Sequence, residues 1–91
     1  MEEIKLNEEQ SWYEVDIDGK LAALTHFTQN GNISIFDHTE TEPAYEGQGL
    51  AAKVVQFALD DVRAKGGKIW PLCPFVLSWL RKHPDYSDLV A

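Results

Sequence analysis

The sequence predicts an α+β domain: an antiparallel meander of strands, then a helix, a further strand and a second helix. Two pairs, Asp18-Gly19 and Asn30-Gly31, separate runs rich in β-branched and aromatic residues, which is typical of two-residue hairpin loops. After Gly47 the apolar residues recur at helical spacing instead. With 91 residues the chain is just long enough for one core without disulfides or metals, so residues 1–91 are expected to form a single domain.

The first half of the chain is predicted to contain three long strands, over residues 12–17, 21–28 and 33–41. The pattern leaves open a short strand over residues 4–6. Consecutive strands joined by two-residue loops pair antiparallel, so these segments predict a meander.

The second half begins with an amphipathic helix that starts near Leu50 and packs on the sheet. Its apolar stripe consists of Leu50, Ala51, Val54, Val55, Ala58, Leu59 and Val62. The pair Gly66-Gly67 supplies a left-handed stop for this helix. Residues 68–70 then form a predicted strand, which ends at Pro71.

A second helix is predicted to begin at Pro74, where the missing N–H costs nothing, and to end before Pro84. Cys73 then lies at or beside its N-cap. The expected buried stripe of this helix is Phe75, Val76, Trp79 and Leu80, and Trp70 of the preceding strand is also expected in the core. The order β-β-β(-β)-α-β-α predicts a mixed sheet in a two-layer or three-layer sandwich.

The net charge of −7 disfavours nucleic acid and anionic membranes as partners, because phosphate groups would be repelled. The charge is also uneven. Most carboxylates precede Gly47, whereas most of the cations follow it: Lys53, Arg63, Lys65, Lys68, Arg81 and Lys82. An anionic ligand is therefore expected to bind in the later half.

The chain has no apolar run long enough to span a bilayer, and its acidic N-terminal segment does not resemble a signal peptide, so a cytoplasmic location is expected. Cys73 is the only cysteine, which excludes an internal disulfide. No Cys-x-x-Cys or His-x-x-His spacing indicates a metal site. Cys73 is either a core residue or a functional thiol.

The loop "EGQG", residues 46–49, allows two interpretations. Glycines at the start of a helix let a diphosphate approach unpaired N–H groups and the positive end of the helix dipole. Equally, two glycines permit a tight turn from strand to helix. The spacing matches neither the dinucleotide fingerprint nor a P-loop, and on the glycines alone the ordinary turn is favoured.

Longer segments carry a family resemblance. The runs "HTETEP", "EGQGLAAKVVQFALDDVRAKGGKI" and "PLCPFVLSWLRKHPDYSDLV" together cover more than half of the chain. They resemble the GNAT superfamily of acetyl-CoA-dependent N-acetyltransferases, and specifically its minimal, stand-alone members of about this length. The resemblance implies a GNAT-like mixed sheet with a coenzyme A cleft, where the third long strand and the strand after the helix splay apart.

The resemblance also implies which residues bind the coenzyme. They are Thr41, Glu42, Glu46, Gly47, Gln48, Gly49, Leu50 and Ala51, with the pyrophosphate on the backbone amides of residues 47–51 and the pantetheine arm near residues 41 and 42. Glu46 departs from the wider signature, which has Arg or Gln there. We interpret its carboxylate as pointing away from the diphosphate.

Cys73 and His38 are the catalytic residues that the resemblance implies. Cys73 could accept the acetyl group as a thioester, or lie beside the coenzyme thiol while an amine attacks directly. His38, which alternation places on one strand face with Ser34, Phe36 and Glu40, could accept the ammonium proton.

Three further residues are open alternatives for the chemistry. Glu40 and Glu42 are rival bases to the histidine. Tyr86 could protonate the leaving thiolate, although in other members of the superfamily this tyrosine lies within the last helix rather than after it.

These features predict an N-acetyltransferase that transfers an acetyl group from acetyl-CoA to an amine. The alternative is a non-catalytic module that binds coenzyme A, and a third interpretation is a structural domain without a ligand. The acidic composition favours a cationic acceptor. The sequence leaves the oligomeric state open.

Overall fold

The computed structural model describes residues 1–91 and contains a five-stranded sheet with two α-helices. The elements are β1 (Glu2–Asn7), β2 (Trp12–Ile17), β3 (Lys20–Asn30), β4 (Ile33–Thr41), the 3₁₀-helix η1 (Pro43–Tyr45), α1 (Leu50–Ala64), β5 (Lys68–Pro71), α2 (Pro74–Lys82) and the 3₁₀-helix η2 (Pro84–Leu89). The strands follow the chain order across the sheet. Strands β1 to β4 pair antiparallel, whereas β5 pairs parallel to β4 after the α1 crossover. The predicted α+β class is confirmed, and the strand left open at residues 4–6 is present as β1.

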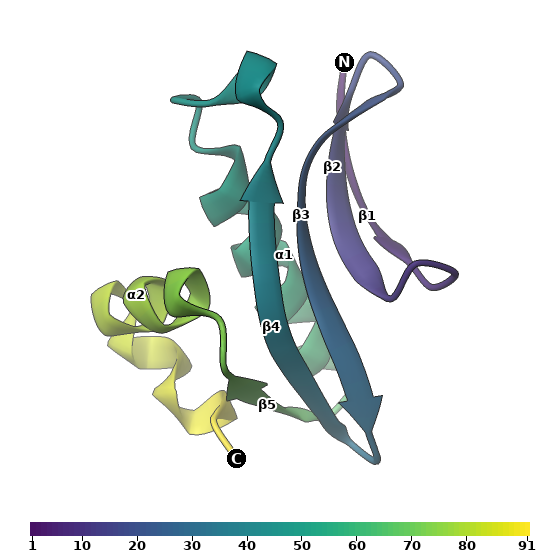
Figure 1. The fold of residues 1–91 in the computed structure, drawn as a ribbon. Coiled ribbons are helices and arrows are strands. Elements are labelled where there is room, and N and C mark those ends of the chain that lie inside the picture. The colour runs from purple at the N-terminus through teal and green to yellow at the C-terminus, as the bar shows by residue number, and fades with distance from the viewer.

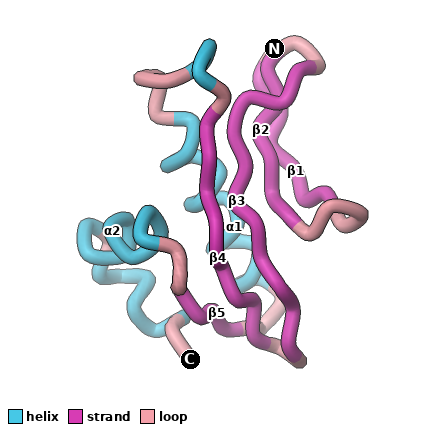
Figure 2. The backbone as a smooth tube through the Cα atoms, viewed as in Figure 1, coloured by secondary structure: helices cyan, strands magenta, loops and turns pink.

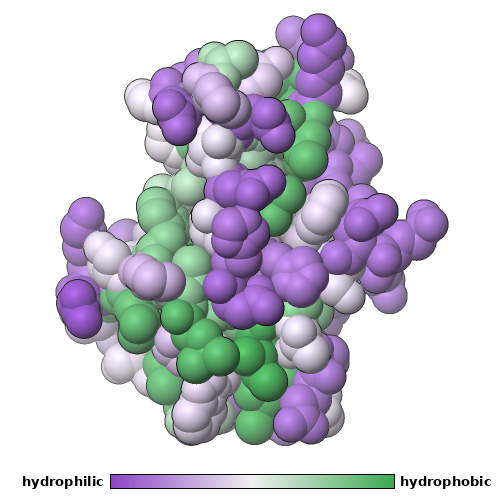
Figure 3. Space-filling model, viewed as in Figure 1, coloured by the Kyte–Doolittle hydropathy of each residue, from purple (hydrophilic) through white to green (hydrophobic).

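The helices leave one face of the sheet uncovered. Helix α1 lies behind the sheet and α2 lies beside β4 and β5, so no helix crosses the front (Figures 1 and 2). Of the two predicted arrangements, the structure therefore has two layers. The uncovered face carries mainly polar side chains at its centre (Figure 3).

One hydrophobic core lies between α1 and the sheet. Its largest fully buried apolar side chains are Phe36, Leu59, Ile69, Val15, Val54, Val55 and Val76. The apolar stripe of α1 supplies much of this core because residues three and four apart lie on one helix face. No helix of the protein is long and apolar enough to cross a membrane.

The two hairpins predicted from the sequence, β2–β3 and β3–β4, both close with two-residue loops. Asp18 and Gly19 both have positive φ, of 51° and 81°, which matches the right-handed twist of the flanking strands. In the second hairpin, Asn30 pairs with Ile33, so the loop is Gly31-Asn32, one residue later than predicted.

An extra residue in β4 changes which side chains share a face. Phe27 pairs with Phe36 and His26 pairs with His38, so Asp37 is a β-bulge with no partner. The expectation that His38 shares a face with Phe36 is therefore wrong. Phe36 is fully buried under α1, whereas His38 lies on the uncovered face.

Two aromatic residues that were expected in the core are exposed. Trp70 is 48% exposed because it lies on the uncovered face of the sheet, paired with Ile35. Phe75 is 38% exposed because it lies in the first turn of α2, facing a cleft rather than the core. The predictions for Val76 and Trp79 are confirmed, since both side chains are buried.

Two neighbouring carboxyl groups, Glu14 and Asp16, lie on the uncovered face of β2. Glu14 accepts hydrogen bonds from Asn7 Nδ2 at 2.9 Å and from Trp12 Nε1 at 2.8 Å. Asp16 Oδ1 is buried without a hydrogen-bond partner. Burial and the adjacent Glu14 carboxylate raise the pKa of Asp16 above its ordinary value of 3.8.

Asp16→Asn is therefore expected to stabilise the fold at neutral pH. A raised folded-state pKa means that ionised Asp16 destabilises the native state above pH 3.8, and this penalty vanishes when both states are protonated at lower pH. We expect a gain of about 1 kcal/mol at pH 7, or roughly 4–8 °C in Tm, that disappears near pH 3. Thermal unfolding at several pH values measures it. Exposed Glu9→Gln serves as control, and a destabilised Asp16→Asn at pH 7 would contradict this account.

Candidate functional site

The turn before α1 presents a run of free backbone donors. Gly47 and Gly49 have φ of 84° and 72°, in the left-handed region that favours glycine. The six consecutive N–H groups of residues 47–52 donate to no acceptor in the protein, because the first intrahelical bond is from Lys53 N–H to Gly49 O. The positive end of the α1 dipole lies at the same place. The turn therefore presents unpaired donors of the kind that an anion can accept.

The turn opens into a cleft of about 550 Å³ between the end of β4 and the start of α2. Its lining residues are Thr39, Glu40, Thr41, Tyr45, Glu46, Gly47, Gly49, Leu50, Ala51, Ala52 and Phe75. The outline of the molecule is indented between the η1 turn at the top and α2 at the left (Figure 3). A cleft of this volume is the size of an ordinary small-molecule site.

Most of the coenzyme-binding residues expected from the sequence line this one cleft. They are Thr41, Glu46, Gly47, Gly49, Leu50 and Ala51. Glu42 and Gln48 are not in the lining. The N–H of Glu42 donates to Ala22 O of β3 at 2.8 Å, so this N–H group is not free to bind a ligand.

Glu46 lies at the mouth of the cleft with an exposed side chain that makes no ion pair or hydrogen bond. No lysine or arginine of the chain lines this cleft. The unpaired groups of positive character in the cleft lining are therefore backbone amides.

Cys73 lies behind the cleft at the N-cap of α2. The residue is 4% exposed, its thiol donates a hydrogen bond to Thr39 Oγ1 at 3.3 Å, and its N–H donates to Phe36 O at 2.9 Å. Thr39 Oγ1 is in turn 2.9 Å from Thr25 Oγ1, in the fully buried centre of the sheet. Cys73 does not line the cleft itself, but its hydrogen-bond partner Thr39 does.

His38 and Glu40 form a pair on the uncovered face, beside the cleft. His38 Nε2 is 2.7 Å from Glu40 Oε2, and both side chains are more than half exposed. Glu40 lines the cleft and His38 does not, so the histidine can influence the cleft only through the Glu40 carboxylate.

The Cys73 contact lies on the opposite face of β4. Successive side chains of a strand alternate between the two faces, so Thr39, which Cys73 contacts, points away from the face that carries His38 and Glu40.

Tyr86 is engaged elsewhere. Its hydroxyl donates to Asp60 at 2.7 Å, its ring packs edge-on against Trp79, and the Arg63 guanidinium lies over it. The hydrogen bond to Asp60 raises the pKa of the phenol. Tyr86 does not line the cleft, so the structure does not bring it to Cys73 or Glu40.

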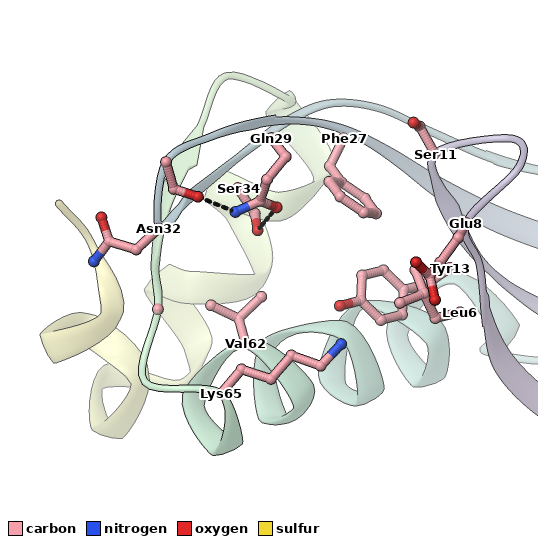
Figure 4. Close-up of a pocket in the computed structure, with 12 residues that line it drawn as sticks. Leu6, Glu8, Ser11, Tyr13, Phe27, Gln29, Asn32, Ser34, Val62 and Lys65 are labelled. Atoms are coloured by element: carbon pink, nitrogen blue, oxygen red, sulfur yellow. Dashed lines mark hydrogen bonds between the residues drawn. The ribbon is translucent and has the colours of Figure 1, made fainter.

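Another cavity, of about 460 Å³, lies at the opposite end of α1 (Figure 4). The Tyr13 and Phe27 rings and Val62 form its apolar part, with Lys65 at its edge. The Gln29 carboxamide across it is held by Ser34 Oγ at 2.8 Å and by Gly31 O at 2.9 Å. None of the predicted site residues lines this cavity.

Thr39 is the site residue that sequence reasoning missed. Simple alternation of side chains along β4 would place Thr39 on the face opposite the buried Phe36. Only the bulge at Asp37 brings Thr39 to the buried face, and nothing in a single sequence marks that bulge. The "HTET" run named Thr41 instead. The exposed Phe75 was missed for a related reason, since helical periodicity does not show which apolar residues face a cleft.

The sequence model of one family matches most of this chain. Residues 12–89 match the family described as GCN5-related N-acetyl-transferase. This span runs from the start of β2 to the end of η2 and includes the whole cleft. A search of curated proteins finds no match.

Solved structures share the fold. A GCN5-like protein from Staphylococcus aureus, with a provisional N-acetyltransferase assignment, has a TM-score of 0.74 at 24% identity, over 98% of this chain and 87% of that one. The ribosomal-protein-S18-alanine N-acetyltransferase of Escherichia coli has a TM-score of 0.66 at 15% identity, over 80% of this chain and 52% of that one. For the N-acetylglutamate synthase of Neisseria gonorrhoeae, solved with coenzyme A and N-acetyl-glutamate, the values are 0.63 and 14%, over 87% of this chain and 21% of that one. At these identities the similarity shows the fold.

Proposed function

Because the chain belongs to the GCN5-related N-acetyltransferase family, we propose that it binds acetyl-CoA and transfers the acetyl group to an amine. The observation that supports this most is the run of six unpaired N–H groups at residues 47–52, which opens into the cleft. Diphosphate is an anion that such a turn suits.

The residues present fit the coenzyme. A Cβ atom added at Gly47 or Gly49 would meet nothing within 4 Å, so the turn faces open space where a diphosphate could approach the backbone. Thr39 and Thr41 line the opposite wall, at the end of β4. Bound acetyl-CoA supplies the thioester whose acetyl group is transferred.

We propose that Glu40, supported by His38, removes the proton from the acceptor ammonium. Glu40 lines the cleft, and its carboxylate is held by His38 at 2.7 Å. The free amine nitrogen then forms a bond to the acetyl carbon, the bond from that carbon to the coenzyme sulfur breaks, and the new amide nitrogen releases its extra proton to water. A positioned base typically contributes 10²–10⁴-fold to the rate of such a step.

We propose that Cys73 serves as the acid that returns a proton, through the Thr39 hydroxyl that lines the cleft, to the departing thiolate, with direct attack by the amine. Cys73 is 4% exposed and its thiol donates a hydrogen bond to Thr39 Oγ1, which is the geometry of an S–H donor rather than of an exposed nucleophilic thiolate.

The net charge of −7 attracts cations to the protein, so it favours a positively charged molecule as the amine that accepts the acetyl group.

The role of Cys73 as an acid predicts that Cys73→Ala turns over slowly but measurably, with kcat lowered by roughly 10²–10⁴-fold. Thiol release from acetyl-CoA with a panel of amines measures the rate. Mass spectrometry of the acid-quenched wild-type protein should find no acetyl group on Cys73. Accumulation of acetylated Cys73, together with an inactive Cys73→Ala variant, would contradict direct attack and establish the thioester route instead.

The uncovered sheet face favours a second candidate function, a module that binds coenzyme A without turnover. No helix covers the side of β4 where His38 and Glu40 lie, so no second layer encloses an acceptor there. Two measurements separate the candidates. Stabilisation by coenzyme A in a thermal-shift titration supports both functions. If coenzyme A stabilises the protein but no amine accelerates thiol release, only the binding-module function remains. Absence of any stabilisation by coenzyme A would contradict both candidate functions.

A further inference from the structure

The outer edge of β1 is a strand edge that no other element pairs with. Strand β1 is six residues long and ends the sheet, with only β2 beside it (Figure 1). At the other end of the sheet, β5 has four residues, and the C-terminal residues already bond to its outer side, where Ala91 N–H donates to Ile69 O at 2.9 Å. An open edge of the length of β1 is a template for pairing with another strand.

The backbone groups that face outward from β1 belong to Glu2, Ile4 and Leu6. Asp18 N–H donates to Met1 O at 3.0 Å, and hydrogen-bonded pairs recur at every second residue of an antiparallel ladder. The odd-numbered residues of β1 therefore bond to β2. The even-numbered residues are left with N–H donors and C=O acceptors that point away from the sheet.

A second copy of this chain fits the edge, because β1 is complementary to itself when two copies run antiparallel with Ile4 opposite Ile4. Glu2 of each copy is then opposite Leu6 of the other, so outward N–H groups meet outward carbonyls. On the uncovered face, Glu3 of each copy lies directly opposite Lys5 of the other. Both side chains are accessible, with exposed fractions of 65% and 48%. They form non-hydrogen-bonded pairs, in which opposite side chains lie closest.

The same charges disfavour the neighbouring registers. A pairing centred on Glu3 would place Glu3 opposite Glu3, and one centred on Lys5 would place Lys5 opposite Lys5. The pairing centred on Ile4 has two opposite-charge pairs instead. The net charge of −7 on each copy opposes association, but at physiological salt the Debye length of about 8 Å screens the charges far from the contact.

The helix side of this edge is apolar. Ile4 and Leu6 pack against the core and are only half-buried, and Phe57 of α1 is 38% exposed. The Phe57 ring is edge-on to that of Tyr13, with centroids 6.1 Å apart, and Tyr13 pairs with Leu6. Phe57 therefore lies near the Leu6 end of β1. Pairing of two copies brings Ile4 against Ile4 and removes part of this apolar surface from water.

We propose that the protein forms a symmetric dimer in which two β1 strands pair antiparallel about Ile4 and join the two five-stranded sheets into one. The two-fold axis passes between the two Ile4 residues, perpendicular to the sheet, so both α1 helices lie on the same face. The candidate coenzyme cleft lies at β4, with β2 and β3 between it and this edge, so both clefts stay open. The dimer therefore does not depend on the proposed function.

Sedimentation equilibrium at fixed, physiological ionic strength tests the dimer. The mass of the wild-type protein should rise from 10.3 kDa towards twice that value between roughly 1 µM and 1 mM. Glu3→Lys should weaken dimerisation at least about tenfold, because both cross-strand pairs become like-charged. The fold should be retained, since the new lysine faces Asp16 of β2 within its own chain. Glu3→Lys combined with Lys5→Glu restores opposite charges across the interface, so this double variant should regain the dimer.

Glu9→Lys is the matched control. It makes the same charge change at an exposed position between β1 and β2, so it should dimerise at least as tightly as the wild-type protein. A wild-type protein that stays monomeric up to the highest concentration would overturn the proposal. So would a Glu3→Lys variant that dimerises like the wild-type protein, or a double variant that is folded by thermal unfolding but remains monomeric.

Amide hydrogen exchange gives a second readout that needs no variant. The N–H groups of Glu2, Ile4 and Leu6 should become protected from exchange as the protein concentration rises, because they acquire acceptors only in the dimer. A dimer that forms without this protection uses another surface and would also overturn the proposal.

Discussion

Gly49→Ala is expected to abolish the thermal stabilisation of the protein by coenzyme A. At a coenzyme concentration 100 times Kd the wild-type protein should gain about 2.7 kcal/mol. Gly49 has a φ of 72°, and its added methyl group would project into the open space that the diphosphate is proposed to occupy. A Cβ there keeps the anion from the N–H groups around it, so the ligand-dependent shift should disappear.

The backbone strain of this substitution needs a matched control, which Gly66→Ala provides. Gly66 ends α1 with a φ of 73°, and a Cβ there also meets nothing within 4 Å. Both variants should lose about 1–2 kcal/mol of stability, because alanine is strained in the left-handed region. Only Gly49→Ala should lose the shift with coenzyme A. Retention of the full shift in Gly49→Ala, or its loss in both variants, would contradict the proposed diphosphate site.

Glu40→Gln is expected to lower kcat/KM for the amine by roughly 10²–10⁴-fold, with little change in the affinity for coenzyme A. Glutamine keeps the size of the side chain and its contact with His38, but it cannot accept the ammonium proton at neutral pH. Rates of thiol release over a range of amine concentrations and pH measure this effect. Loss of the base should make the residual rate rise with pH, because only the fraction of amine already deprotonated in solution can react.

His38→Ala should have a smaller effect than Glu40→Gln, since the histidine does not line the cleft and acts through the carboxylate. Glu3→Gln is the control for charge, because Glu3 lies on the same uncovered face of the sheet, on β1, away from the cleft. A Glu40→Gln variant with unchanged kcat/KM would remove Glu40 from the chemistry. A larger loss in His38→Ala would make the histidine the base.

Much of the fold could be predicted because it depends on neighbouring residues. The Asp18-Gly19 hairpin, the start of α1 after Gly49 and the proline at the first position of α2 are each decided within a few residues by backbone sterics. The glycine turn and its place at the head of an amphipathic helix are local in the same sense. For that reason, most of the coenzyme-binding residues expected from the sequence do line one cleft.

The faces of the last long strand could not be predicted. One extra residue, Asp37, reverses the alternation after Phe36, moves His38 to the uncovered face and brings Thr39 to the thiol of Cys73. A bulge is stabilised by the pairing of two strands and by the packing of both faces, and it leaves no fixed sign in either segment. The burial of Trp70 and Phe75 could not be predicted for the same reason. Both are apolar, but only the packing of the other elements shows that both remain exposed.

The sequence by itself therefore determined the order of the elements, the left-handed glycine turn and the excess of negative charge, because these follow from composition, local sterics and periodicity. Only the tertiary structure decided which side chains meet. It paired Glu40 with His38 and Cys73 with Thr39, on opposite faces of β4. It also placed Lys82 beside the first turns of α1, although about thirty residues separate them along the chain. Such contacts depend on strand register and on the packing of one helix against another, which residues distant in the sequence establish together.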